Sequence, residues 1–153
     1  MKTVDVFVAL AFLLTVSCND DESKNCREDE AIPVETFYAA FDDLKCDIQN
    51  VEEEDDKELL VIRNQEDLDM YLDCPTEPQI DFTEYFVIAG IYTHHQCAVL
   101  ENQVILNCHA VRLIHKVLLS ELACQAITPL FYAAVIERKY LDLPIEREIV
   151  FSN

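Results

Sequence analysis

The order of apolar and polar residues divides the chain into a short apolar run, an acidic segment and a longer segment with the pattern of a β-rich domain. The apolar run, residues 6–16, is interrupted only by Thr15. It is too short to span a bilayer, which needs roughly 20 residues. It follows an early lysine and precedes small residues, as is typical of a signal peptide. We therefore expect residues 1–17 to be a signal peptide.

The middle of the chain predicts a strand followed by a helix. Residues 59–62 form a short apolar run typical of a strand. Asn64 is a favoured N-cap residue, and the acidic residues that follow suit the positive end of a helix. Leu68 and Leu72 lie four residues apart and would share one buried face. This pattern predicts a helix at about residues 65–73.

The second half of the chain has the composition of a β-sheet. Residues 85–93 are rich in β-branched and aromatic residues, which indicates a buried strand. Gly90, the only glycine of the protein, predicts a bulge or a close backbone approach in that strand. We expect turns of an antiparallel meander near residues 101–102 and 120–121. The alternation over residues 145–151 predicts a last strand with one solvent-facing side.

The start of the domain allows two interpretations. Residues 32–38 have the composition of an opening strand, whereas Phe37, Phe41 and Leu44 have helical spacing. We favour the strand. The whole pattern predicts an α+β fold, with a mainly antiparallel sheet of about five strands and at least one short helix, in a single domain over residues 31–153.

Acidic residues outnumber basic residues by 30 to 11, which gives a formal charge of −19. The charge is uneven: residues 18–84 hold 23 acids and 5 bases, and residues 85–153 hold 6 acids and 5 bases. Such a field repels nucleic acid, which we exclude as a partner, because nucleic-acid binding needs a basic surface. The same field attracts basic surfaces, so we expect a protein partner of this domain to carry basic charge.

The residues around Cys18 resemble the lipobox of bacterial lipoproteins. Val16 and Ser17 fit the two positions before the lipidated cysteine, while Thr15 stands where leucine is usual. The acidic residues after Cys18 are similar to the tract that follows the lipidated cysteine in surface lipoproteins of some Gram-negative bacteria. The resemblance implies a lipidated acidic tether over residues 18–30. It also implies a cell-envelope location, anchored in the outer membrane or exposed at the cell surface. The alternative is cleavage after Ser17 and secretion.

The cysteine count agrees with lipidation at Cys18. Seven cysteines leave one unpaired in an oxidising compartment. If Cys18 carries the lipid, six remain for three disulfide bonds, which would stabilise the domain. These six candidates are Cys26, Cys46, Cys74, Cys97, Cys108 and Cys124.

A second resemblance covers residues 58–153. A strand, the helix "IRNQEDLDMYL", the segment "IDFTEYFVIAGIYT" and the later "YAAVIERK" are similar to small lipoprotein domains of the protease-complex-subunit-B-like family. The resemblance carries no catalytic signature, and it implies an α+β binding domain.

Histidines and cysteines cluster around the first expected turn. If the chain reverses there, His95 faces Cys108 and His94 faces His109, which gathers the nitrogen and sulfur ligands that zinc or copper uses. Cys97 would lie diagonally from Cys108, so a disulfide between these two is the competing interpretation. The metal candidates are therefore His94, His95 and His109.

Catalytic signatures are absent from the sequence. After residue 17 the chain holds only Ser23, Ser120 and Ser152, and its single glycine cannot build a nucleophile elbow or a phosphate-binding loop. We expect a non-enzymatic cell-envelope lipoprotein without a cofactor, which binds a protein or is displayed at the surface. The alternative function is a metal-binding lipoprotein that uses the three histidines.

Overall fold

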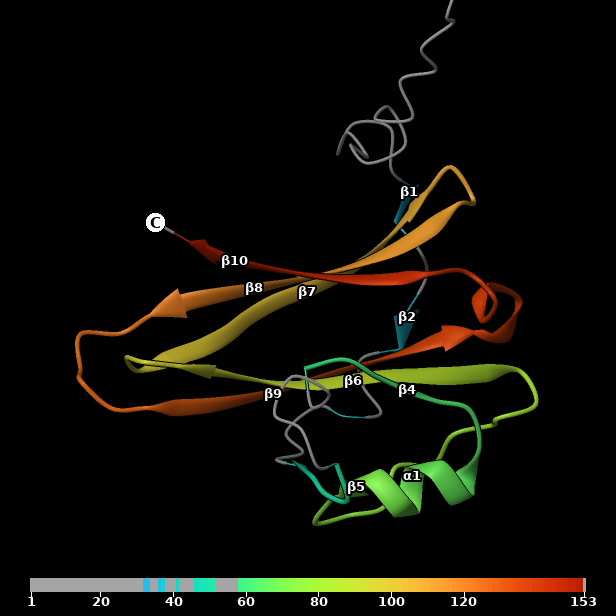
Figure 1. The fold of residues 1–153 in the computed structure, drawn as a ribbon, viewed down its shortest axis with the longest axis horizontal. Coiled ribbons are helices and arrows are strands. Elements are labelled where there is room, and N and C mark those ends of the chain that lie inside the picture. The colour runs from blue at the N-terminus through green and yellow to red at the C-terminus, as the bar shows by residue number, and fades with distance from the viewer. Residues whose placement is uncertain (1–31, 34–35, 38–40, 42–45, 52–57, 153) are drawn as a thin grey trace, which may run out of the picture.

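The computed structural model describes residues 32–33, 36–37, 41, 46–51 and 58–152. It confirms the predicted α+β class, since one short helix accompanies a mainly antiparallel set of strands (Figure 1). The predicted signal peptide and tether, residues 1–17 and 18–30, lie outside the described residues. Within the described part of the chain, no helix is long and apolar enough to cross a membrane.

The strands are divided between two four-stranded sheets and a two-stranded one. Sheet A contains, in spatial order, β1 (Ile32–Pro33), β7 (Ala98–Cys108), β8 (Arg112–Glu121) and β10 (Ile145–Ser152). Sheet B contains, in spatial order, β2 (Thr36–Phe37), β9 (Thr128–Glu137), β6 (Tyr85–His94) and β4 (Leu60–Ile62). The small sheet pairs β3 (Asp47–Ile48) with β5 (Leu72–Asp73). Among the described residues, the helical elements include α1 (Gln65–Tyr71) and the 3₁₀ helix η4 (Arg138–Tyr140). Neighbouring strands are antiparallel, except for β8 and β10, which are parallel.

The domain has three layers. Sheet A lies over one face of sheet B, and α1 with the small sheet covers the other face (Figure 1). Between the large sheets, Phe86 and Ile88 pack with Ile105 and Leu113. Strand β6 is buried on both faces because it lies in the middle layer, which explains why its sequence is a continuous apolar run instead of an alternation.

The predicted strand and helix of the middle segment are confirmed. Asn64 caps α1, since its side-chain oxygen accepts a hydrogen bond from the Asp67 N–H at 2.8 Å. Leu68 and Leu72 are both buried, as expected. The helix ends at Tyr71, earlier than predicted, because Leu72 and Asp73 pair with β3. Here strand pairing overrides local helical propensity.

The turn predicted at residues 101–102 is wrong. β7 continues through these residues with a bulge between Leu100 and Asn102, and the chain reverses only after Cys108. His109 and Ala110 have φ angles of 52° and 57° at this turn. A left-handed alanine is uncommon, so composition gave no signal for a turn here. The second predicted turn, near residues 120–121, is close to the end of β8 at Glu121.

The first and last strands are placed by long-range pairing. The predicted strand at residues 32–38 is split into β1, which pairs with β7, and β2, which pairs with β9. The predicted last strand is confirmed as β10, an edge strand of sheet A. Its glutamates, Glu146 and Glu148, are exposed, whereas Arg147 is half-buried between the sheets.

Candidate functional site

The structure does not bring the three predicted metal ligands together: the rings of His94 and His95 lie 6.2 Å apart, but His109 is distant from both. His94 ends β6 and pairs with Thr128, whereas His109 follows the far end of β7. An eleven-residue strand is roughly 35 Å long, which separates the two ends of β7 widely. Among the described residues, no group of three or more His, Cys, Asp or Glu side chains is arranged to hold a metal ion. The expected pairing of His95 with Cys108 was wrong because the chain does not turn where we expected.

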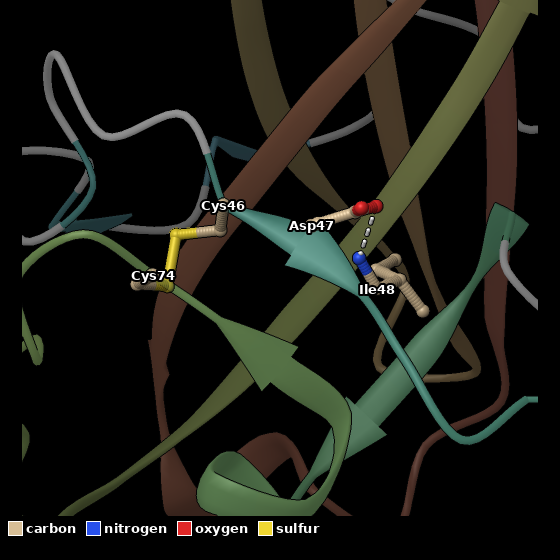
Figure 2. The surroundings of a disulfide bond; sticks show 4 residues. All are labelled: Cys46, Asp47, Ile48 and Cys74. Atoms are coloured by element: carbon tan, nitrogen blue, oxygen red, sulfur yellow. Dashed lines mark hydrogen bonds between the residues drawn. A yellow bond between two sulfur atoms is a disulfide. The ribbon is translucent and has the colours of Figure 1, made fainter.

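Disulfide bonds join parts of the chain that are distant in sequence. Cys46, directly before β3, bonds to Cys74, directly after β5, and so closes the small sheet (Figure 2). Next to this bond, the Ile48 N–H donates to the Asp47 carboxylate at 2.9 Å. Cys97 bonds to Cys124, so the competing interpretation, a bond between Cys97 and Cys108, was also wrong.

The predicted disulfide stabilisation is confirmed for the described cysteines. Cys108 is also disulfide-bonded, and its partner is outside the described residues because the other four described cysteines bond to one another. Cys18 and Cys26 lie outside the described residues. Oxidised cysteines are typical of proteins outside the cytosol.

A polar network that we did not predict lies between the two large sheets. His115 on β8 has no exposed surface. Its Nε2 lies 2.9 Å from the Gln103 side-chain oxygen, and the Gln103 amide donates to the Ala133 carbonyl at 2.9 Å. Because the Gln103 oxygen can only accept, Nε2 must carry the hydrogen. The other ring nitrogen, Nδ1, is buried and has no hydrogen-bond partner among the described residues.

Burial holds His115 in its neutral form. Burial, together with the smaller effect of the positive charge of Arg147, lowers the pKa of His115 to about 4. A proton on Nδ1 would add a charge where water and acceptors are excluded. His115 lies on the buried side of β8, at alternating positions with Leu113, Val117 and Leu119. That alternation is visible in the sequence and was the signal we missed.

The network continues to the edge of the sandwich. Tyr132 donates to the main-chain carbonyl of Glu58, and Arg147 donates to the Glu58 carboxylate and, at 3.4 Å, to the Tyr132 hydroxyl. Burial raises the pKa of Tyr132, and the neighbouring Arg147 partly offsets this. Tyr132 and His115 are enclosed, so a substrate has no access to them in this structure. The network joins β10 of sheet A to β9 and to the start of β4 in sheet B.

The connections at one end of the sandwich form a surface that we call the tip, residues 95–99 and 122–127 (Figure 1). The Cys97–Cys124 disulfide crosses it. The Leu122 N–H donates to the Cys97 carbonyl at 2.7 Å, and the Cys97 N–H donates to the Cys124 carbonyl at 3.4 Å. These bonds hold the β6–β7 and β8–β9 connections side by side.

The tip exposes apolar side chains and no formal charge. Val99, Leu122 and Ile127 are exposed by 44%, 47% and 71%. Neither of its segments contains Asp, Glu, Lys or Arg. At its border, His94 Nε2 contacts the Glu121 carboxylate at 2.9 Å, and its ring packs 4.8 Å from that of Phe151. All three belong to the two segments of the tip, so this uncharged end of the sandwich offers apolar side chains to a partner.

Comparison with known proteins does not place the chain in a family. No protein-family model, curated protein or solved structure matches it. The resemblances to surface lipoproteins and to protease-complex-subunit-B-like domains stay predictions from the sequence.

Proposed function

We propose that this protein is a non-enzymatic lipoprotein of the cell envelope, anchored through Cys18, whose domain binds a partner protein at the tip. The observation that carries the proposal is the uncharged apolar surface at the tip of a protein with a formal charge of −19. Disulfide bonds at five described cysteines support an exported protein. The lipobox-like residues around Cys18 support the anchor. Secretion without lipid is the alternative location.

The chemistry of the tip supports binding of a folded partner. Its exposed Leu122 and Ile127 offer apolar area, and burying such area is the main favourable contribution to protein association. The disulfide and the main-chain hydrogen bonds order the tip before binding, which lowers the entropy lost on association. The acidic charge of the remaining domain favours a partner with basic residues around an apolar centre, because opposite charge accelerates encounter.

Site-specific photocrosslinking tests the binding surface. A photoreactive phenylalanine analogue at Ile127 should give a discrete covalent adduct in intact cells. The same analogue at Val111, which is 60% exposed at the opposite end of the sandwich, is the matched control and should not give it. In the protein that carries the analogue at position 127, the additional substitution Leu122→Ser should reduce the amount of adduct at least severalfold. Equal adducts from both positions, or none from Ile127, would contradict the proposal.

Intact mass of the protein extracted from membranes tests the anchor. We expect a chain that begins at Cys18 and carries acyl groups. Cys18→Ala should abolish both the added mass and the membrane association. An unacylated chain that is soluble in both versions would show that the protein is secreted.

A further inference from the structure

Strand β10 forms the one long edge of the two large sheets in the described part of the chain (Figure 1). Sheet A ends at β1 and β10, and sheet B ends at β2 and β4. β1 and β2 have two residues each and β4 has three, whereas β10 has eight. A short edge strand protects a sheet from pairing with other chains, and a long one offers a template for such pairing. We propose that the free edge of β10 binds an extended segment of a partner protein in which basic residues alternate with apolar ones. β10 is no part of the tip, so this binding does not depend on the proposed function of the tip.

Alternate backbone groups of β10 point away from β8. The Leu113 N–H donates to the Pro144 carbonyl at 2.8 Å, and the parallel pairing of β10 with β8 continues without a register shift to the end of the strand. Because successive residues of a strand direct their N–H and C=O groups to opposite edges, the even-numbered residues of β10 bond to β8. The residues whose backbone groups face the free edge are Ile145, Arg147, Ile149 and Phe151. Among the described residues, these groups have no backbone hydrogen-bond partner, so an added strand can bond to them.

Features that protect other edge strands are missing from β10. It contains no proline, and its pairing with β8 has no bulge. An inward-pointing charge is a further protection, and Arg147 does point inward. Its guanidinium, however, donates to the Glu58 carboxylate and to the Tyr132 hydroxyl, so its charge is neutralised between the sheets and does not oppose a neighbouring strand. Every residue of β10 keeps some exposed surface.

The charges beside the edge favour a basic partner. Glu146 and Glu148 are exposed and lie on the face of β10 opposite to that of Arg147. Arg112 on β8 contacts the Glu146 carboxylate at 3.0 Å, and Lys116 on β8 lies opposite Glu148. Both cations are on the side of β8, so a strand added on the other side of β10 lies next to the glutamates. Opposite charges on neighbouring strands are favourable, and the formal charge of −19 adds attraction at longer range.

A second copy of the chain fits this edge less well. A twofold antiparallel pairing centred on Arg147 places Glu146 opposite Glu148, and one centred on Glu148 places this residue opposite its own copy. Like charges at opposed positions are destabilising. A segment with basic residues two positions apart instead supplies a cation to each glutamate. The residue between them points the same way as Ile149 and Phe151, which pack between the sheets, so an apolar side chain suits it.

A fluorescent peptide tests the binding. The probe has the length of β10, eight residues, with lysine and valine in alternation. Its charge-matched control has the lysines in the first half and the valines in the second. In fluorescence anisotropy with the full chain in a zwitterionic detergent, the alternating peptide should bind severalfold more tightly than the control.

Variants of the protein locate the charge effect. Glu146→Gln with Glu148→Gln should weaken binding of the alternating peptide severalfold. Glu66→Gln with Glu84→Gln removes the same charge at exposed positions away from β10 and should not. Equal binding of both peptides, equal losses in both variants, or no binding of the alternating peptide would overturn the inference.

Amide hydrogen exchange, read residue by residue by NMR, tests the edge itself. In the protein alone, the N–H groups of Glu148 and Val150 should exchange slowly because they bond to β8, and those of Ile149 and Phe151 should exchange fast. The alternating peptide should slow exchange at Ile149 and Phe151. Unchanged exchange there with peptide bound would overturn the inference. Slow exchange at these two residues without peptide, lost on dilution, would show a second copy at the edge and would also overturn it.

Discussion

Gly90 lies where its neighbours leave no room for a side chain. A Cβ at this position would lie within 3.0 Å of the Glu58 carbonyl oxygen and the Tyr132 hydroxyl. These two groups form the hydrogen bond that connects β9 to the start of β4. The predicted close approach at Gly90 is therefore confirmed, and the glycine is required by space, with no bulge in the β6–β9 pairing.

Gly90→Ala should destabilise the domain by about 1–3 kcal/mol, because the methyl group overpacks a buried site and displaces Tyr132. Chemical denaturation followed by circular dichroism measures the effect. In a Tyr132→Phe background the hydroxyl is absent, but the ring carbon Cζ and the Glu58 carbonyl oxygen still crowd the methyl, so the substitution should still destabilise the domain, by less. Strict additivity of the two changes would contradict this explanation.

His115 makes stability depend on pH. Its pKa is about 4 in the folded protein, below the ordinary histidine value of about 6.5. The unfolded chain therefore binds a proton as the pH falls through 6.5, while the folded chain does not. The contribution of neutral His115 to the free energy of unfolding is therefore fully present above about pH 6.5 and is lost as the pH falls towards 4. It amounts to about 3 kcal/mol at most.

His115→Gln should remove this component, since glutamine can donate to Gln103 without titrating. The free energy of unfolding, measured from pH 7 to 4, should therefore fall less in the variant than in the natural protein. His95→Gln, at an exposed position, serves as the control and should behave like the natural protein. A constant difference between His115→Gln and the natural protein across this range would be inconsistent with a neutral buried histidine.

At the scale of the element, α1 depends on its first turn. Asn64 accepts from the Asp67 N–H and donates to the Asp67 carboxylate at 3.0 Å, and that carboxylate also accepts from the Arg63 N–H at 3.3 Å. Only seven residues follow the cap, so the helix has little stability of its own. Its position over sheet B depends on the cap and on the buried Leu68.

Asn64→Ala should lower the free energy of unfolding by about 1 kcal/mol, because the orphan N–H groups of the first turn lose their acceptor. Thermal or denaturant unfolding measures the loss. Asn64→Ser keeps an acceptor at the cap without placing a second carboxylate against Asp67, and it should recover most of the loss. If alanine and serine behave alike, the cap does not stabilise α1.

At the scale of the whole molecule, the charge opposes the compact fold. The formal charge is −19, and the acids are concentrated in the first half of the chain. Like charges repel one another, and salt screens this repulsion over distances of roughly 10 Å at 0.1 M. Raising sodium chloride from 10 mM to 0.5 M should therefore increase the melting temperature by several degrees, as read by calorimetry.

Neutralising Glu52, Glu53 and Glu54 to glutamine is the control for this effect. It removes three negative charges, so the variant should melt at a higher temperature in low salt and respond less to added salt. An identical salt response in both proteins would show that general salting-out, and not charge repulsion, raises the melting temperature.

Local patterns predicted the elements that depend on near neighbours in the sequence. The start of α1 at its asparagine cap, the buried strand β6 and the alternating strand β10 follow from caps and side-chain periodicity, which involve residues a few positions apart. The α+β class and the oxidised cysteines were predicted in the same way. Each of these features was determined by the sequence alone.

The tertiary structure decided which distant residues meet. Composition carried no signal for the turn at His109 and Ala110, and one misplaced turn shifted the expected partners of Cys97, His94 and His95. The site of His115 depends on Gln103, Tyr132 and Arg147, which come from separate strands. Such contacts arise when sheets pack and exclude water. Packing depends on the whole chain, and local propensity reports only on residues that are neighbours in sequence.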